Sequence, residues 1–131
     1  QPNGSHTPFS VRTTEVFKPF GIDSEVSEYE NSVYYTDYII KSLIDKISSA
    51  SGDRPWVFVI TSDHGTYVDD VRITRSIDFP ASFMVPGIVV TNSEEIYQSQ
   101  IEYLQKCQYI FHENMSKMLG RMMGYDIPKS D

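Results

Sequence analysis

A run of four apolar residues, Val57-Phe58-Val59-Ile60, leads through Thr61 and Ser62 into the tripeptide Asp63-His64-Gly65. An apolar run without apolar/polar alternation is typical of a central strand in a parallel sheet, covered on both faces. Polar residues that follow such a strand stand where open α/β sheets bind their ligands. Carboxylate and neutral imidazole are both zinc ligands, so Asp63 and His64 are candidate metal ligands.

The same tripeptide has a simpler interpretation as a turn. Asp63 would then accept hydrogen bonds from backbone amides, and Gly65 would supply a positive φ. Adjacent Asp-His pairs are common, so the tripeptide taken alone favours the turn over the metal site. The rest of the chain has to decide between the two.

Composition limits the classes of protein to which the chain can belong. The 131 residues, of which 40% are hydrophobic, predict one globular domain over residues 1–131. The formal net charge of −7 argues against binding to nucleic acid or to anionic lipid. No apolar stretch approaches about 18 residues, so we expect no transmembrane helix and a soluble chain. The chain begins with Gln1 and shows no signal peptide, which predicts a piece of a longer protein. Its single cysteine, Cys107, excludes an internal disulfide and is expected to be buried.

The first half of the chain predicts a loop followed by one long helix. Proline and glycine are frequent in residues 1–24, which predicts a loop that carries His6. Ser27 and Glu30 fit a capping box, and apolar residues at helical spacing predict a helix that ends before Gly52. Asp37 lies on the apolar face of this helix, and we interpret it as a buried or half-buried acid that bonds a neighbouring loop. The face is formed by Val33, Ile40, Ile44 and Ile47, with Tyr29, Thr36 and Leu43 beside them.

The second half predicts a polar loop, an interrupted strand and a helical region. Within the loop from Thr66 to Asp78, Arg72 and Arg75 are candidate ligands of an anionic substrate group. The interpretation that we prefer is that they pair on the surface with Asp69, Asp70 or Asp78. Phe83–Pro86 and Ile88–Val90, broken by Pro86 and Gly87, predict an edge or bulged strand. From Ser93 to Met123 the chain is apolar on one side, with methionines that we interpret as core filling. This order predicts an α/β fold with a partly parallel sheet and helices packed on it.

Three stretches occur in the same order as in a known family: Gly4–Phe9, Tyr29–Tyr38 and Ile60–Gly65. They resemble the carboxyl-terminal half of the sulfatase-like phosphoethanolamine transferases, which belong to the alkaline-phosphatase-like superfamily with the phosphoglycerol transferases and lipoteichoic acid synthases. The closing stretch, Cys107–His112 through Gly120 and Gly124, is similar to the last core helix of that family. The resemblance implies a partial alkaline-phosphatase-like (sulfatase-like) fold with a mixed, mostly parallel sheet flanked by helices.

The resemblance also implies an activity. Members of this family are zinc-dependent enzymes that upstream helices anchor in the bacterial inner membrane, with the catalytic domain facing the periplasm or cell exterior. They move phosphoethanolamine or a related phospho-alcohol from a phospholipid to a lipid A or cell-envelope glycan acceptor, through a phosphorylated threonine, and so modify lipopolysaccharide. Asp63 and His64 match two of the zinc ligands. His6 matches a histidine that stabilises the substrate phosphate or the leaving group.

The chain departs from the family pattern in three ways. The family has Glu directly after Asp-His-Gly and a further His downstream, whereas this chain has Thr66 and no histidine before His112. Thr7 stands where Gly is usual, and His112 matches a helix position that we interpret as structural.

The nucleophilic threonine and the acidic zinc ligand of the family match no residue here, because they belong to its upstream half. We therefore expect an incomplete zinc site and no turnover from these residues alone. The alternatives are a sulfatase or phosphodiesterase-type hydrolase, a phosphoglycerol transferase, and a non-catalytic sulfatase-like module, which the missing histidine favours.

Overall fold

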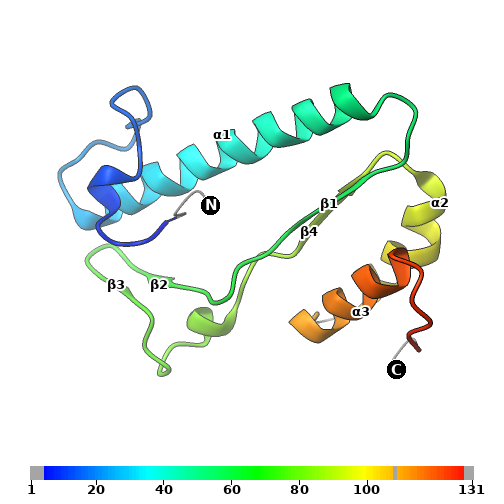
Figure 1. Cartoon of the computed structure of the whole chain (residues 1–131). Coiled ribbons are helices and arrows are strands. Elements are labelled where there is room, and N and C mark those ends of the chain that lie inside the picture. The colour runs from blue at the N-terminus through cyan, green and yellow to red at the C-terminus, as the bar shows by residue number, and fades with distance from the viewer. Residues whose placement is uncertain (1–4, 108, 129–131) are drawn as a thin grey trace. The chain divides into compact units, whose positions relative to one another are not determined.

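The computed structural model describes residues 5–107 and 109–128, which form two compact units. Unit 1 takes its described residues from Gln1–Ala50 and Ser62–Pro86, and unit 2 takes its own from Ser51–Thr61 and Gly87–Asp131. Figure 1 labels their helices and strands. The single domain expected over residues 1–131 stays a prediction.

Unit 1 is built on the long helix α1 (Glu25–Ser51), which the helical spacing of apolar residues predicted. The helix begins before the expected capping box at Ser27, because Ser24 caps it. The Ser24 hydroxyl oxygen accepts a hydrogen bond of 3.1 Å from the Ser27 amide, and its carbonyl accepts one of 3.1 Å from the Glu28 amide. Gly52 follows the helix with a φ of +56°, so the predicted glycine stop is confirmed.

The apolar face of α1 is less covered than its pattern predicted. Val33 and Leu43 are exposed, and Asp37 is exposed as well, so the expectation that it is buried or half-buried is wrong. The buried residues of α1 are instead polar: Asn31 and Ser32 are each 1% exposed. Buried polar side chains near the amino-terminal end of α1 therefore help to hold the helix in unit 1.

The loop before α1 packs on the first turns of the helix. Phe9, in a short 3₁₀-helix (Phe9–Val11), is 2% exposed and lies edge-to-face on Tyr29 with ring centres 5.2 Å apart. The Asn31 amide nitrogen donates to the Gly21 carbonyl (2.6 Å), while its side-chain oxygen accepts from the Phe20 amide (3.1 Å). These bonds satisfy a buried amide and fix the loop on the helix.

The rest of unit 1 is more regular than the loop that the sequence predicted. Strands β2 (Tyr67–Val68) and β3 (Ile73–Thr74) pair antiparallel as a small hairpin. A 3₁₀-helix (Pro80–Phe83) follows, so the expectation that Phe83 begins a strand is wrong. Proline at the first position of this turn agrees with its fixed φ.

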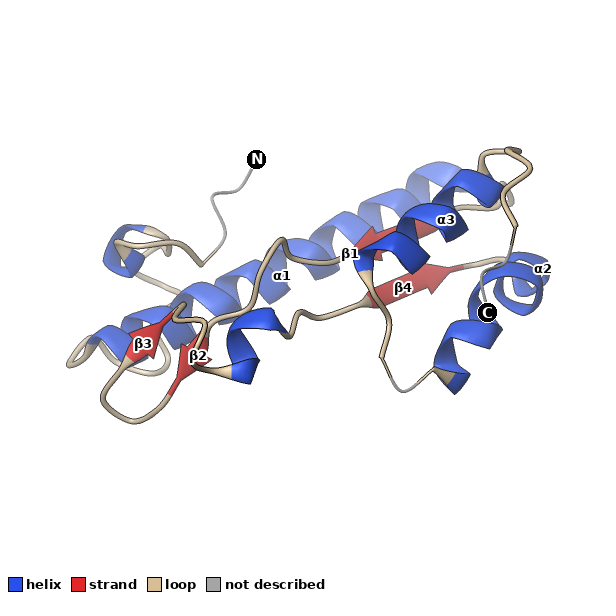
Figure 2. Ribbon diagram, turned by 90° about the horizontal axis from the view of Figure 1, so that it is seen from below, coloured by secondary structure: helices blue, strands red, loops and turns tan. Residues whose placement is uncertain are grey.

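Unit 2 contains the predicted strand β1 (Val57–Ile60), paired with β4 (Ile88–Thr91). The two strands are antiparallel, with Val57 opposite Thr91 and Ile60 opposite Ile88. Figure 2 shows this strand pair and the β2–β3 hairpin in red. The α/β class is confirmed, but every strand pair within the described residues is antiparallel, so the mostly parallel sheet is not found there. An apolar run that is covered on both faces does not fix the direction of its partner.

Helical segments complete unit 2. A short helix α2 (Glu94–Ile96) continues as a π-helical turn (Tyr97–Ile101) and a 3₁₀ turn (Glu102–Lys106), and α3 (His112–Met122) follows after a break. Cys107 lies in this break and is exposed, so the expectation that it is buried is wrong. Ile101, Leu104 and Met118 form the buried core, against which Val59 and Val89 of the two strands pack. The interpretation of the methionines as core filling is confirmed for Met115 and Met118.

None of the helices in the described part of the chain combines the length and the apolar character needed to cross a bilayer.

Candidate metal-binding site

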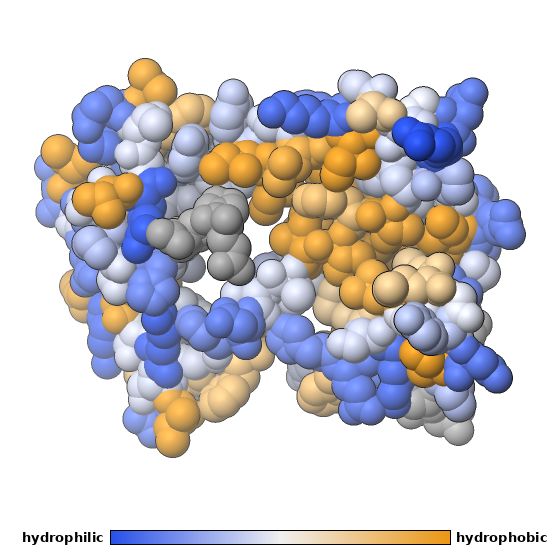
Figure 3. All heavy atoms as spheres, in the orientation of Figure 1, coloured by the Kyte–Doolittle hydropathy of each residue, from blue (hydrophilic) through white to orange (hydrophobic). Residues whose placement is uncertain are grey.

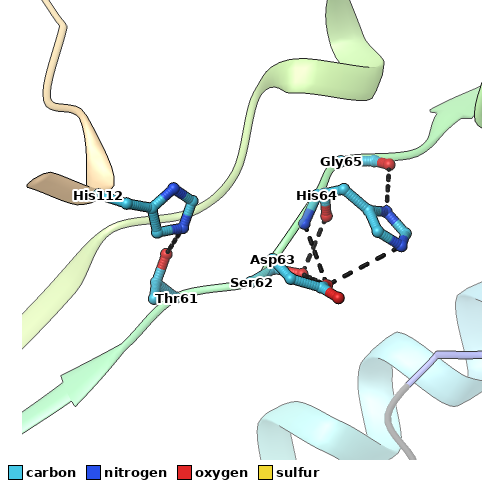
Figure 4. A network of polar contacts seen from close by, with 6 residues as sticks. All are labelled: Thr61, Ser62, Asp63, His64, Gly65 and His112. Carbon is cyan, nitrogen blue, oxygen red and sulfur yellow. Dashed lines mark hydrogen bonds and ion pairs between the residues drawn. The ribbon is translucent and has the colours of Figure 1, made fainter. Parts of the chain in front are cut away.

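The tripeptide Asp63-His64-Gly65 orients its imidazole without help from another element (Figure 4). His64 Nδ1 lies 2.9 Å from the Gly65 carbonyl oxygen. A carbonyl can only accept, so Nδ1 carries the proton and Nε2 keeps its lone pair in the neutral ring. Histidines that bind metals are commonly oriented by a hydrogen bond of this kind.

Asp63 lies beside the same imidazole. Its Oδ1 is 3.9 Å from His64 Nε2 and accepts a hydrogen bond of 3.0 Å from the His64 backbone amide. Attraction to the His64 side chain lowers the pKa of the Asp63 carboxyl, and the hydrogen bonds that it accepts act in the same direction. The Asp63 side chain is 90% exposed and that of His64 44% exposed, so both are accessible to an ion from solvent.

Gly65 is required by a close approach of two backbone segments. A Cβ at this position would lie 2.1 Å from the Ala81 carbonyl oxygen and 2.3 Å from that of Met84. The Gly65 amide donates to the Ser82 carbonyl at 2.9 Å, which fixes the segment against the 3₁₀-helix. Gly65 does not have the positive φ that the turn interpretation required, so that part of the interpretation is wrong.

The two donors are of the kind that binds zinc, but they lie further apart than tetrahedral zinc requires. Tetrahedral zinc with bonds of about 2.0–2.1 Å places neighbouring donor atoms about 3.3 Å apart, a little closer than the 3.9 Å between His64 Nε2 and Asp63 Oδ1. The described residues contain no group of three or more potential metal ligands, so a zinc site at Asp63 and His64 stays a prediction.

His6 is oriented by the same local device as His64. Its Nδ1 lies 3.0 Å from the Thr7 carbonyl, to which it donates, and its side chain is exposed. Arg12 holds this loop: its Nε donates to the His6 carbonyl at 2.8 Å and its Nη2 to the Thr7 carbonyl at 3.3 Å. Gly4, the first residue of the motif, lies outside the described residues. His6 is not gathered with Asp63 and His64 into a three-ligand group, so its role stays a prediction.

The two arginines that the sequence singled out differ in their surroundings. Arg72 forms an ion pair with Asp69 (3.2 Å), and its guanidinium lies 4.8 Å from the ring centre of Phe79. Arg75 is exposed, and its charge opposes the rise that burial causes in the pKa of Tyr29. Arg72 therefore stabilises the loop that carries it, and a role for either arginine in substrate binding stays a prediction.

With this geometry established, the chain can be compared with known proteins. The family model described as Sulfatase matches residues 1–120. The chain belongs to the sulfatase family. No curated protein and no solved structure gives a match. Family membership supports the partial alkaline-phosphatase-like fold and places the chain among enzymes of hydrolase or transferase type.

One contact of this sulfatase-family chain was missed by sequence reasoning. Within unit 2, Thr61 Oγ1 and His112 Nε2 share a hydrogen bond of 3.3 Å (Figure 4). His112 is the first residue of α3, and the bond links that helix to the residue after β1. Nothing in the spacing of the two residues predicts the contact. The closing motif also contains Gln108, which lies outside the described residues.

Proposed function

We propose that this chain is the carboxyl-terminal part of a zinc-dependent, membrane-anchored transferase of the bacterial inner membrane, with its catalytic domain facing the periplasm or cell exterior. The enzyme moves phosphoethanolamine, or a related phospho-alcohol, from a phospholipid to a lipid A or cell-envelope glycan acceptor. The observation that supports the proposal best is the His64 imidazole, which donates Nδ1–H to Gly65 and leaves Nε2 3.9 Å from Asp63 Oδ1.

In this proposal Asp63 and His64 hold the zinc together with ligands from the upstream half of the same protein. Bound zinc supplies positive charge that stabilises a transferring phosphoryl group. A carboxylate such as Asp63 is ionised at neutral pH, and the Gly65 carbonyl keeps the neutral His64 ring in the tautomer that leaves Nε2 to coordinate. His6 contributes Nε2 toward the substrate phosphate or leaving group, while the nucleophilic threonine comes from the upstream half.

A hydrolase of the sulfatase or phosphodiesterase type is the second candidate, because the matching family model is that of the sulfatases. The metal ligands would be the same, and water would replace the acceptor hydroxyl. The full-length enzyme, incubated with a phosphatidylethanolamine donor and a lipid A acceptor, separates the two. Transfer of the headgroup to lipid A supports the transferase, whereas release of free phosphoethanolamine with no acceptor product supports the hydrolase.

Zinc binding tests the site itself. Chelator competition should give weak binding to the 131-residue chain, since two donors rarely hold zinc tightly, and much tighter binding to the full-length protein. In the full-length protein, Asp63→Ala and His64→Ala should each weaken zinc binding by at least about tenfold. Asp70→Asn, which changes an exposed carboxylate in the same unit, should leave it unchanged.

Two results would contradict the proposal. If the full-length protein binds no zinc, the proposals of a zinc-dependent transferase and of a zinc-dependent hydrolase both fail. A non-catalytic sulfatase-like module is then the better interpretation. If it binds zinc equally well after both substitutions, Asp63 and His64 are not its ligands.

A further inference from the structure

A hollow of about 450 Å³ lies in unit 1 between the loop before α1 and the helix itself. Three of its lining residues are aromatic (Phe20, Tyr29 and Tyr34), two are acidic (Glu30 and Asp37), and the last is Val33. The proposed transferase chemistry uses none of these side chains. Aromatic faces combined with carboxylates attract organic cations, because the ring quadrupole and the negative charge act on the same ligand.

The aromatic wall is held in place by contacts of its own. Phe20 lies edge-to-face on Tyr34, with ring centres 6.0 Å apart and an interplanar angle of 85°. The backbone of Phe20 donates to the side chain of Asn31, which is 1% exposed. Tyr29 is fixed from the other side by its edge-to-face contact with Phe9. The hollow is therefore a preformed feature and needs little ordering when a ligand enters.

The charge of Arg75 acts on Tyr29, one of the lining residues, but the two carboxylates of the hollow have no ion-pair partner of their own among the described residues. Neither Glu30 nor Asp37 takes part in an ion pair within the described residues. They stand two helical turns apart on one face of α1, with Val33 and Tyr34 on the turn between them. The formal net charge of −7 favours a cation at this surface further.

We propose that this hollow binds a small organic cation with an alkylated ammonium group, held over the rings of Phe20 and Tyr34 and neutralised by Glu30 and Asp37. Aromatic faces suit the methyl groups of a quaternary ammonium, which carry the charge without needing hydrogen bonds. A hydrated metal ion gains less, because Phe20 and Val33 cannot coordinate it and only Glu30 and Asp37 offer carboxylates. The inference does not depend on zinc or on the transferase reaction.

Calorimetric titration of the chain with choline tests this site. We expect saturable binding that weakens as sodium chloride is added. The neutral isostere 3,3-dimethylbutan-1-ol has the same shape without the charge and should bind at least about tenfold more weakly. Glu30→Gln and Asp37→Asn should each weaken choline binding by roughly fivefold. Tyr34→Leu should weaken it by about twofold to fivefold.

Asp45→Asn is the matched control, because Asp45 is an acid on the same helix that pairs with Lys41 outside the hollow. It should leave choline binding unchanged, and circular dichroism of every variant should match that of the wild type. Vesicles of phosphatidylcholine identify the source of the cation: binding to them that free choline blocks assigns a lipid headgroup, and choline binding without vesicle binding assigns a free ligand. The proposal is overturned if choline gives no saturable heat, if the neutral isostere binds equally well, or if Asp45→Asn weakens binding as much as Asp37→Asn does.

Discussion

The imidazoles of His6 and His64 are oriented by the same short-range bond. Each donates Nδ1–H to the carbonyl of the next residue, Thr7 in one case and Gly65 in the other. Such a bond fixes the tautomer and the direction of the ring without a partner from another element. Both side chains therefore present Nε2 to an incoming ligand as soon as the local backbone has formed.

Gly65→Ala tests whether the backbone contact at this glycine holds the metal-binding tripeptide. A Cβ would overlap the carbonyl oxygens of Ala81 and Met84, so one backbone segment must move. We expect the free energy of unfolding, measured by urea denaturation, to fall by about 1–3 kcal/mol. Gly87→Ala is the control, because its Cβ would meet only the sulfur of Met115 at 3.9 Å. Equal stability of the two variants would show that the contact at Gly65 is not tight.

The ionisation of Tyr29 should make unit 1 sensitive to alkali. Burial raises the pKa of Tyr29 above 10.0, although the charge of Arg75 opposes the change. The folded state thus favours the neutral phenol. Its contribution to stability is full below the pKa of the unfolded state and is lost as the pH rises through the raised value.

Tyr29→Phe cannot ionise, so between about pH 9 and about pH 11 it should lose less stability to urea than the wild type does. Tyr125→Phe, at a tyrosine that is 64% exposed, should follow the wild type. Parallel losses in the wild type and in Tyr29→Phe would contradict the assignment.

At the level of elements, the sequence predicts what local patterns determine. Helix α1 and strand β1 follow from apolar spacing and from an apolar run. The antiparallel direction of β4 was not predicted, because the residues between β1 and β4 were interpreted as a crossover connection. They contain a hairpin and a 3₁₀-helix instead. The break before α3 was also missed. Asn114 stabilises this break, because its side-chain oxygen accepts a hydrogen bond of 2.9 Å from the Phe111 amide. The asparagine stands within a helical pattern of apolar residues, so the sequence did not indicate a break there.

The structure places the cap of α1 at Ser24, whereas the sequence predicted it at Ser27. Ser24→Ala removes the acceptor of the Ser27 amide and should lower stability by about 1 kcal/mol in thermal unfolding followed by circular dichroism. Ser27→Ala keeps that amide bond and removes only a hydroxyl contact of 2.9 Å with Ser24, so its cost should be smaller. A larger cost for Ser27→Ala would restore the cap predicted at Ser27.

On the scale of the whole molecule, the sequence selected the residues of the candidate site but not their geometry, and their role as metal ligands stays a prediction. The strand-end position and the family resemblance singled out Asp63 and His64, because both depend on residue types in order along the chain. The close backbone approach at Gly65 was not predictable, since it depends on Ala81 and Met84, which are distant in sequence. The hollow on α1 was missed for a related reason: Phe20 reaches it from a separate segment that Asn31 holds.

Apolar side chains also remain on the surface of the chain (Figure 3). On α1, the apolar side chain of Leu43 is 41% exposed, and several apolar side chains elsewhere in the chain are exposed as well. Phe9, in contrast, is a buried apolar side chain of unit 1. Large exposed apolar patches mark interaction sites, and under the proposed function we expect the upstream half of the enzyme to cover the surface around Leu43, which lies on α1 beyond the residues that line the hollow. The 131-residue chain alone should therefore enhance the fluorescence of the apolar dye ANS, and the full-length protein should do so much less.

Leu43→Lys should lower the dye signal of the chain alone, because it replaces exposed apolar surface on α1 with a charge. Ser49→Lys adds the same charge on the same helix at an exposed polar position and should leave the signal nearly unchanged. The added charge attracts the anionic dye equally in both variants, so the difference between them reports the apolar contact alone. If the full-length protein binds as much dye as the 131-residue chain, the upstream half does not cover the surface of α1 around Leu43.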